Sequence, residues 1–270
     1  MNHLLRQLAP VPEAGWQAIE DEAKSRLETH LAARKLVDFD GPLGWSHSAT
    51  TLGRTASIAG PLADVTSSQR RVLPLVELRA DFVLHRSEID DAERGARNLD
   101  FPGLEEATRR IALAENTSVF HGYAAGQISG ITESASHAAL TLSSDAEQYP
   151  AAVAGAVDVL RRAGIGGPYG LALSPEIYTE ITKTAEHGGH LLLDHLRRIL
   201  DGPLVWAPGV DGGIVLSLRG GDFVFECGQD ISIGYTSHDA ETVKLYFEES
   251  FSFRVLEPDA AVALRTKKKG

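Results

Sequence analysis

The stretch VKLYFEESFSFRV, residues 243–255, has the clearest β-strand pattern in the chain. Its apolar side chains fall at alternate positions: Val243, Leu245, Phe247, Phe251, Phe253 and Val255. Polar and charged side chains lie between them: Lys244, Glu248, Ser250 and Arg254. Because successive side chains of a strand point to opposite faces, this pattern predicts one long strand with an apolar face. Glu249 interrupts the apolar row, so we expect a bend or bulge there.

Other strand signals lie upstream of this segment. LPLVELRADFVL, residues 73–84, alternates imperfectly between apolar and polar side chains and predicts a second strand. Residues 214–218 and 223–227 flank Gly220-Gly221, a dipeptide typical of tight hairpin turns. We therefore predict that these two segments form a β-hairpin.

Helical spacing is clearest in residues 13–33. One apolar stripe runs along this segment: Trp16, Ile19, Ala23, Leu27 and Leu31. Such a stripe usually serves the helix's own core. This segment lies outside any obvious local core, so packing against a neighbour or binding a peptide is the second interpretation.

The middle of the chain predicts a long helix followed by a small α/β unit. Residues 103–123 have helical spacing, and the unit spans about residues 145–208. Within it we expect helices at 147–163, 175–185 and 191–200, and strands at 169–173 and 204–207. Ser174 before Pro175 is the expected cap of one helix, and Ser87 of a shorter helix near residues 88–94.

Residues 41–71 are rich in Ser, Thr and Gly and poor in large apolar residues. A compact domain rarely tolerates so long a structureless loop unless the loop is functional. We therefore expect a two-stranded arm that extends and pairs with another subunit.

Composition excludes several functional classes. The formal net charge is −11, opposite to the sign that wrapping nucleic acid requires, so we expect no nucleic-acid partner. No apolar run approaches the ~20 residues of a membrane helix, and residues 1–7 lack a secretory signal, which favours a cytoplasmic protein without a membrane partner. The single cysteine, Cys227, allows no intrachain disulfide and is expected as a buried apolar side chain. Lys267–Lys269 are interpreted as a solvated terminus.

No set of residues supports catalysis. The chain has no G-x-S-x-G nucleophile motif and no phosphate loop ending in Gly-Lys-Ser/Thr. Glu248 and Glu249 are adjacent on a strand and cannot face one substrate together. His187 and His190, in the sequence HGGH, match no established metal-ligand spacing. We expect no catalytic residues, no metal and no cofactor, and therefore no enzyme.

Several blocks of the sequence together resemble the encapsulin family. They keep the order and spacing of that family across the whole chain: AARKLVDFDGPLGW at 32–45, LPLVELRADFVL at 73–84, EIDDAERGARNLD at 88–100, GPYGLALSPEIY at 167–178, RGGDFVFECGQDISIGY at 219–235 and VKLYFEESFSFRVLEPDA at 243–260. The opening Leu8-Ala9-Pro10 and Trp16 also fit. Part of the family is described as linocin or bacteriocin proteins.

The resemblance implies an α+β fold, that of the tailed-phage (Hong Kong 97-type) major capsid protein. Its expected parts are an N-terminal arm and amphipathic helix (1–45), an extended loop (46–72), a peripheral domain (73–140 and 222–270) and an axial domain (141–221). The resemblance also implies self-assembly into an icosahedral shell, of about 60 copies or a larger multiple.

The family's shells form bacterial nanocompartments that enclose a cargo enzyme, either a dye-decolourising peroxidase or a ferritin-like protein. The cargo carries a C-terminal targeting peptide, extended and of the Leu-Gly-Ile type, which needs an apolar groove with a few polar anchors. The residues expected to bind it are Leu27, Leu31, Arg34, Asp38, Asp230, Ile231 and Ile233. The alternative is that Leu27 and Leu31 only seat their helix on its own sheet.

The resemblance further places His187, Gly188, Gly189 and His190 at the axial tip, lining a five-fold pore. Converging histidines would form a pH-sensitive ring there; the alternative is a solvated loop. Two rival functions stay open from sequence alone: a phage or prophage major capsid protein, and a bacteriocin or protease-like activity.

Overall fold

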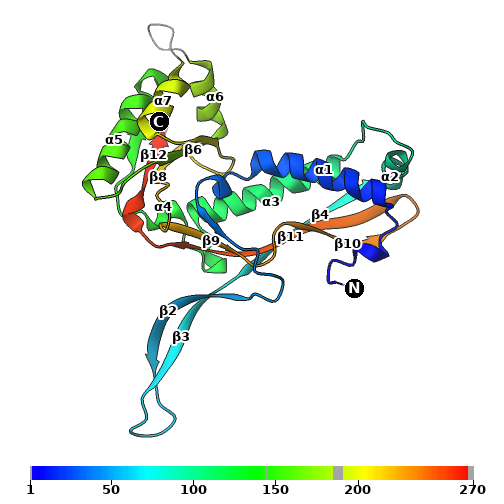
Figure 1. Ribbon diagram of the computed structural model, residues 1–270, viewed down its shortest axis with the longest axis horizontal. Helices are drawn as coiled ribbons and strands as arrows, with labels where there is room; N and C mark the ends of the chain where they lie inside the picture. Colours follow the sequence, from blue (N-terminus) through cyan, green and yellow to red (C-terminus); the bar gives the residue numbers. More distant parts are fainter. Residues whose placement is uncertain (1, 144, 185–190, 267–270) are drawn as a thin grey trace.

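The computed structural model of the chain describes residues 2–143, 145–184 and 191–266 (Figure 1). The strand at the carboxyl end, β11, organises a first sheet, in the order β1-β9-β11-β10 with β4 also paired to β11. Its strands are β1 (Asp38–Asp40), β4 (Val76–His85), β9 (Phe223–Cys227), β10 (Ser232–His238) and β11 (Thr242–Val255).

β11 confirms the predicted long strand but not the predicted irregularity at Glu249. Its pairing with β4 runs without a break in register from Thr242 to Phe251. On its other side, β11 pairs with β10 as far as Glu248 and with β9 from Phe251 onward. At Glu249 the strand therefore changes its partner on one side, from β10 to β9, without a bulge in its pairing with β4, and the Glu249 side chain is paired with Arg34 in the interior.

Helices cover one face of this sheet (Figure 1). They are α1 (Glu13–His30), α2 (Arg86–Glu93) and α3 (Pro102–His121). Trp16 and Ile19 of α1 pack with Leu104 of α3 and with Phe82 and Phe247 of the sheet in one apolar core. Burial of these side chains, rather than intrinsic helix propensity, holds the helices on the sheet. The residue before α2 is His85, whose side chain makes no capping bond, so the cap predicted at Ser87 is wrong.

A second sheet has the order β5-β12-β8-β6-β7. Its strands are β5 (Leu140–Leu142), β6 (Tyr169–Leu173), β7 (Leu204–Trp206), β8 (Gly213–Ser217) and β12 (Ala261–Thr266). The helices of this part are α4 (Ile131–Ser134), α5 (Tyr149–Arg162), α6 (Pro175–Lys183) and α7 (Leu192–Leu200). Ser174 caps α6 as predicted, accepting a hydrogen bond from the Ile177 N–H at 3.4 Å.

The two sheets correct two expectations. β8 and β9 flank the Gly220-Gly221 turn, but β8 pairs with β6 and β12 while β9 pairs with β1 and β11, so the predicted hairpin is wrong. Both glycines have positive φ and turn the chain, but the turn carries it from one sheet to the other. β12 likewise pairs with β8, which contradicts the assignment of all of 222–270 to the peripheral domain.

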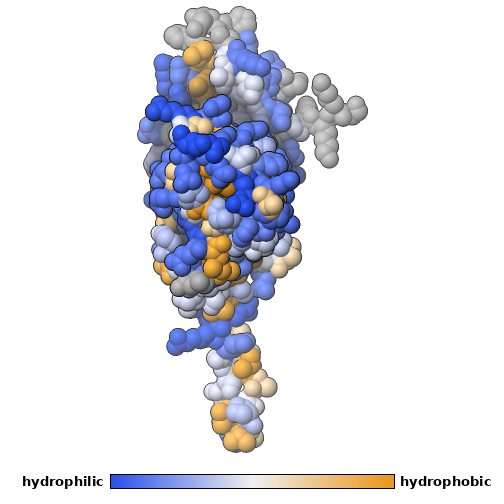
Figure 2. Space-filling model, turned by 90° about the vertical axis from the view of Figure 1, so that its right-hand side faces the viewer, coloured by the Kyte–Doolittle hydropathy of each residue, from blue (hydrophilic) through white to orange (hydrophobic). Residues whose placement is uncertain are grey.

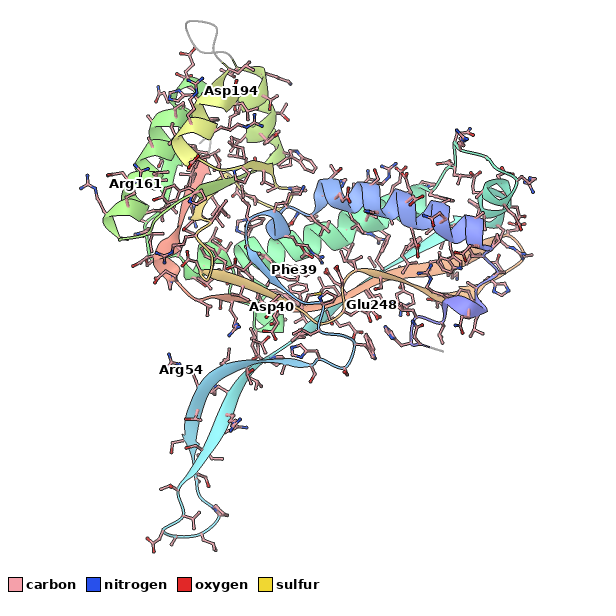
Figure 3. All side chains as sticks on the ribbon, viewed as in Figure 1. Phe39, Asp40, Arg54, Arg161, Asp194 and Glu248 are labelled. Carbon is pink, nitrogen blue, oxygen red and sulfur yellow. The ribbon has the colours of Figure 1, made fainter. Side chains whose placement is uncertain are left out.

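The polar stretch forms a two-stranded antiparallel arm, β2 (Ala49–Ile58) with β3 (Ser67–Pro74), that projects from the body of the molecule (Figures 1 and 2). At its base, Thr50 is buried and its hydroxyl lies 2.6 Å from that of Ser252 on β11. Figure 3 shows Arg54 on the arm, outside the body, whereas Glu248 lies on the first sheet. The arm is thus anchored at one end and unsupported along its length.

Short 3-10 turns complete the described elements: η1 (Arg6–Leu8), η2 (Ala33–Lys35), η3 (Ala124–Gly126), η4 (Ala146–Gln148) and η5 (Pro258–Ala260). None of the helices in the described part of the chain is long and apolar enough to cross a membrane.

Candidate functional site

A groove of about 430 Å³ lies between the second half of α1 and strand β10. Its lining is mainly apolar: Leu4, Ala23, Leu27, Leu31, Ile231, Ile233 and Phe247. Six of the seven residues that were predicted to bind a peptide line this groove: Leu27, Leu31, Arg34, Asp230, Ile231 and Ile233. Residues far apart in sequence therefore meet in one concave surface.

The apolar stripe of α1 divides into two parts. Trp16, Ile19 and Ala23 are buried against the sheet and α3, with exposures of 8%, 0% and 3%. Leu27 and Leu31 are only half-buried, and both line the groove. Leu27 also packs against this core, but both leucines leave apolar surface uncovered in the single chain.

Charged side chains form the rim of the groove. Arg6 pairs with Glu20 at 2.5 Å and lies over the ring of Trp16 at 4.1 Å. Lys24 and Glu28, one helical turn apart on α1, are 3.9 Å apart. These pairs are solvated, so they shape the entrance more than they stabilise the fold.

Arg34, from η2, closes one end of the groove with three carboxylates. Its guanidinium donates to Glu115 of α3 at 2.7 Å, to Glu249 of β11 at 2.9 Å and to Asp230 at 2.5 Å. Glu115 is fully buried and the Glu249 side chain is 1% exposed, whereas the Asp230 side chain is 47% exposed. Arg34 therefore connects the buried acids to an acid that the groove presents to solvent.

The pKa values of this cluster follow from its burial. Burial alone would lower the pKa of Arg34, but the charge and hydrogen bond of Glu115, with the charges of Glu249 and Asp230, raise it overall. Burial raises the pKa of Glu249 well above its usual range, and the nearby Glu115 raises it further, while Arg34 offsets only part of the effect. The Oε1 atoms of Glu115 and Glu249 have no hydrogen-bond partner among the described residues. The side chains of Glu249 and Glu115 lie within hydrogen-bonding reach of each other.

Asp38 is the predicted residue that the structure places elsewhere. It lies on β1 and lines a separate hollow of about 190 Å³ with Lys35 and Gly220. Its Oδ2 accepts a hydrogen bond from the Gly221 N–H at 2.6 Å. Asp38 was expected from the resemblance alone, and its place on β1 puts it outside the groove.

The N-terminal segment supplies a wall of the groove that sequence reasoning missed. The Tyr235 N–H donates to the Leu4 carbonyl at 2.8 Å, which places Leu4 beside β10. His3 stacks on Trp45 at 3.7 Å and lies 3.2 Å from Glu248, so the segment is also held on the sheet. Leu4 and Leu5 carry no periodicity, and only their apolar character could have drawn attention to them.

Two other candidates have different outcomes. His187, Gly188, Gly189 and His190, the predicted pore residues, lie outside the described residues, as do Lys267–Lys269. Cys227 is buried, as expected for an apolar side chain, and burial raises the pKa of its thiol to about 12.

Comparisons of the fold identify capsid proteins. A virus-like particle protein from Pyrococcus furiosus matches with a TM-score of 0.61 at 17% identity, over 92% of this chain and 98% of that chain. The capsid of Myoviridae phage XM1 matches with a TM-score of 0.52 at 12% identity, over 86% of this chain and 90% of that chain. The chain therefore has the α+β fold of phage major capsid proteins, as predicted.

Comparisons of the sequence identify the family. A family model described as an encapsulating protein for peroxidase matches residues 1–252. A type 1 encapsulin shell protein of Rhodospirillum rubrum is 48% identical, over 98% of this chain and 97% of its own length. Another from Mycobacterium tuberculosis is 42% identical, over 98% and 99% of the two chains. The predicted family is thus confirmed: the chain belongs to the type 1 encapsulins and is a shell protein rather than an enzyme.

Proposed function

We propose that about 60 copies of this chain, or a larger icosahedral multiple, close into a nanocompartment around a cargo enzyme. In this proposal the groove between α1 and β10 holds the cargo by an extended, Leu/Ile-rich peptide at its C-terminus. Chemistry then belongs to the enclosed enzyme, while the shell provides enclosure and docking.

The observation that carries the docking proposal is the division of the α1 stripe. Leu27 and Leu31 continue the buried row of Trp16, Ile19 and Ala23, but they face Ile231 and Ile233 across an open groove. Apolar surface gathered in a concave site with a few polar groups is typical of a site that binds a ligand or peptide. Asp230 and Arg34 at one end supply polar anchors for the peptide.

The proposed cargo is a peroxidase of the dye-decolourising class. The description of the matching family, an encapsulating protein for peroxidase, supports this choice. A ferritin-like protein is the second candidate, supported by the resemblance of the sequence to the family as a whole.

The arm and the pore have proposed roles in the same assembly. The exposed apolar residues of the arm favour contact with a neighbouring copy of the chain, because a partner would cover them. Residues 187–190 are proposed to line a pore, on the sequence resemblance alone.

The substitution Leu31→Asp tests the docking proposal. A charge in the half-buried lining should prevent an apolar peptide from seating, while the buried half of α1 keeps the subunit folded. We expect shells of normal size that lack cargo when co-expressed with a tagged peroxidase, measured by electron microscopy and by the cargo-to-shell ratio. Leu31→Met, which keeps the apolar surface, is the matched control and should load normally. Normal loading of Leu31→Asp would show that this groove does not hold cargo.

A further inference from the structure

Strand β10 is the last strand of the first sheet in the described part of the chain. It pairs with β11 along one side, and its other side borders the groove. A strand at the edge of a sheet presents unpaired N–H and C=O groups that can pair with another extended chain. The direction of each backbone group on β10 therefore decides what the groove can bind.

Two backbone hydrogen bonds fix these directions. The Tyr235 N–H donates to Leu4, on the side away from β11. The Ser250 N–H of β11 donates to the Gln229 carbonyl at 2.9 Å, toward the β10 side. Since backbone groups alternate along a strand, Glu248 and Tyr246 of β11 also point toward β10, where they face Ser232 and Gly234.

By the same alternation, Ile233 and Tyr235 of β10 point their backbone groups to the open edge. Ile231, directly before the strand, continues this outward row. The Ile231 N–H is already bonded to Asp230 Oδ1 at 2.8 Å, and that of Tyr235 to Leu4. The N–H and C=O of Ile233 lie between these two positions, at the middle of the groove.

We propose that the peptide held in this groove binds as an added β-strand on the edge of β10, with its backbone hydrogen-bonded to the N–H and C=O of Ile233. This inference rests on the proposed function, because the occupant is the cargo's extended Leu/Ile-rich peptide. The carbonyl of the chain's own Leu4 already accepts a hydrogen bond from the Tyr235 N–H, which shows that this edge can bind the backbone of another segment. Leu4 also marks the end of the space, so the peptide lies between Leu4 and Asp230.

Physical chemistry favours this mode over contact through side chains alone. An apolar peptide that fills the groove removes water from the edge of β10, and backbone groups left without partners would then oppose binding. A peptide that binds as a strand supplies hydrogen-bond partners for these backbone groups. Its successive side chains then point to opposite faces of the sheet. Residues two apart, such as the Leu and Ile of a Leu-Gly-Ile sequence, then face the same side and reach Leu27, Leu31 and Ile231 together.

The same geometry limits the length of the paired segment. The outward row spans from Ile231 to Tyr235, which corresponds to about four residues of an added strand at ~3.3 Å per residue. Residues of the peptide beyond this segment lie past Asp230 or meet the N-terminal segment at Leu4.

A backbone methylation scan tests the mode of binding on assembled, cargo-free shells. The probe is a labelled synthetic peptide, Ser-Gly-Leu-Gly-Ile-Gly-Ser-Lys, and each variant carries one N-methyl group on a successive amide. We expect about a three- to tenfold loss of affinity at alternate positions, whose N–H faces β10, and little change at the positions between them. Equal affinity for every methylated peptide, or equal loss at every position, would overturn the added strand.

The same experiment separates this inference from the proposed function. The unmodified peptide is also measured on Leu31→Asp shells, with Leu31→Met shells as the control. Suppose that the peptide binds in a way that depends on Leu31, but that its affinity does not alternate with the position of the methyl group. This result would contradict the added strand and still support the docking groove. Binding that is absent, or independent of Leu31, would overturn the groove itself.

Discussion

The arm formed by β2 and β3 and the groove beside α1 both leave apolar side chains uncovered, but their shapes are opposite. Ile58, Leu62 and Val65 at the end of the arm are 49%, 72% and 47% exposed, and they lie on a narrow projection (Figure 2). The lining of the groove is concave and backed by the core. The apolar side chains of a narrow projection are buried only when the projection packs against a larger partner. Those of a groove are buried when a short peptide binds inside it. The contrast supports the two proposals made above, that the arm contacts a neighbouring copy and that the groove binds the cargo peptide.

The largest expected effect is loss of assembly after substitutions at the tip of the arm, which tests the arm's side of this comparison. The double substitution Leu62→Asp and Val65→Asp places two charges where a neighbouring copy is proposed to cover the chain. We expect complete loss of shells, measured by light scattering and electron microscopy, with unassembled subunits that still bind the peptide probe. Asp64→Asn, at the same tip, adds no charge and should assemble. Normal shells from the double variant would mean that the tip is not an assembly contact.

The second largest expected effect is a loss of stability when Arg34, at the end of the groove, is replaced. Arg34→Ala leaves Glu115 and Glu249 buried without their cation, and removal of one partner of a buried ion pair costs about 3–5 kcal/mol. We expect a matching fall in the free energy of unfolding by chemical denaturation, together with weaker peptide binding. Arg97→Ala, at an exposed position, is the control for loss of a surface arginine. Unchanged stability of Arg34→Ala would contradict the buried cluster.

The smallest effect sharpens the description of that cluster. The pKa of Glu249 is raised in the folded chain, so the folded chain holds the proton more tightly than the unfolded chain. This contribution to stability is fully present below the pKa of the unfolded chain, 4.5, and is lost as the pH rises through the pKa of the folded chain. Glu249→Gln keeps a donor toward Glu115 and does not titrate. The free energy of unfolding of Glu249→Gln, compared with that of the wild type, should therefore differ little at pH 4.5. Above that pH the variant should become the more stable of the two, by at most about 1.4 kcal/mol for each pH unit.

Thermal unfolding of both proteins between pH 5 and 9 measures this difference. Glu106→Gln, at an exposed position of α3, is the matched control for loss of a carboxylate at the surface. A constant difference for Glu249→Gln would mean that Glu249 is ionised in the folded chain throughout this range.

Patterns that depend on local burial could be predicted from the sequence, and patterns that depend on distant partners could not. The alternation at 243–255 predicted β11 to within one residue at its start, because one face of that strand is buried along its length. The Gly220-Gly221 turn was located correctly, but a turn does not determine which strands pair after it. Glu249 was expected to distort the strand, since its partner Arg34 lies 215 residues away in sequence.

The candidate site shows the same limit. Leu27 and Leu31 were predicted from spacing and resemblance, and the structure brings them together with Ile231 and Ile233. Asp38 was expected from the resemblance alone and lies on β1, outside the groove, and Leu4 was missed because a single backbone hydrogen bond to Tyr235 positions it. Neither the direction of Asp38 nor the path of the N-terminal segment is encoded in a local pattern.

The passage of the chain from β11 through η5 into β12 has a mechanical consequence. Phe251 and Phe253 of β11 belong to the same apolar core as Leu171, Val215 and Leu264 of the second sheet. A close-packed core shared by two sheets resists bending between them. Each subunit should therefore behave as a stiff unit, so a shell of such subunits would take up pressure, swelling or changes in curvature mainly at the contacts between subunits.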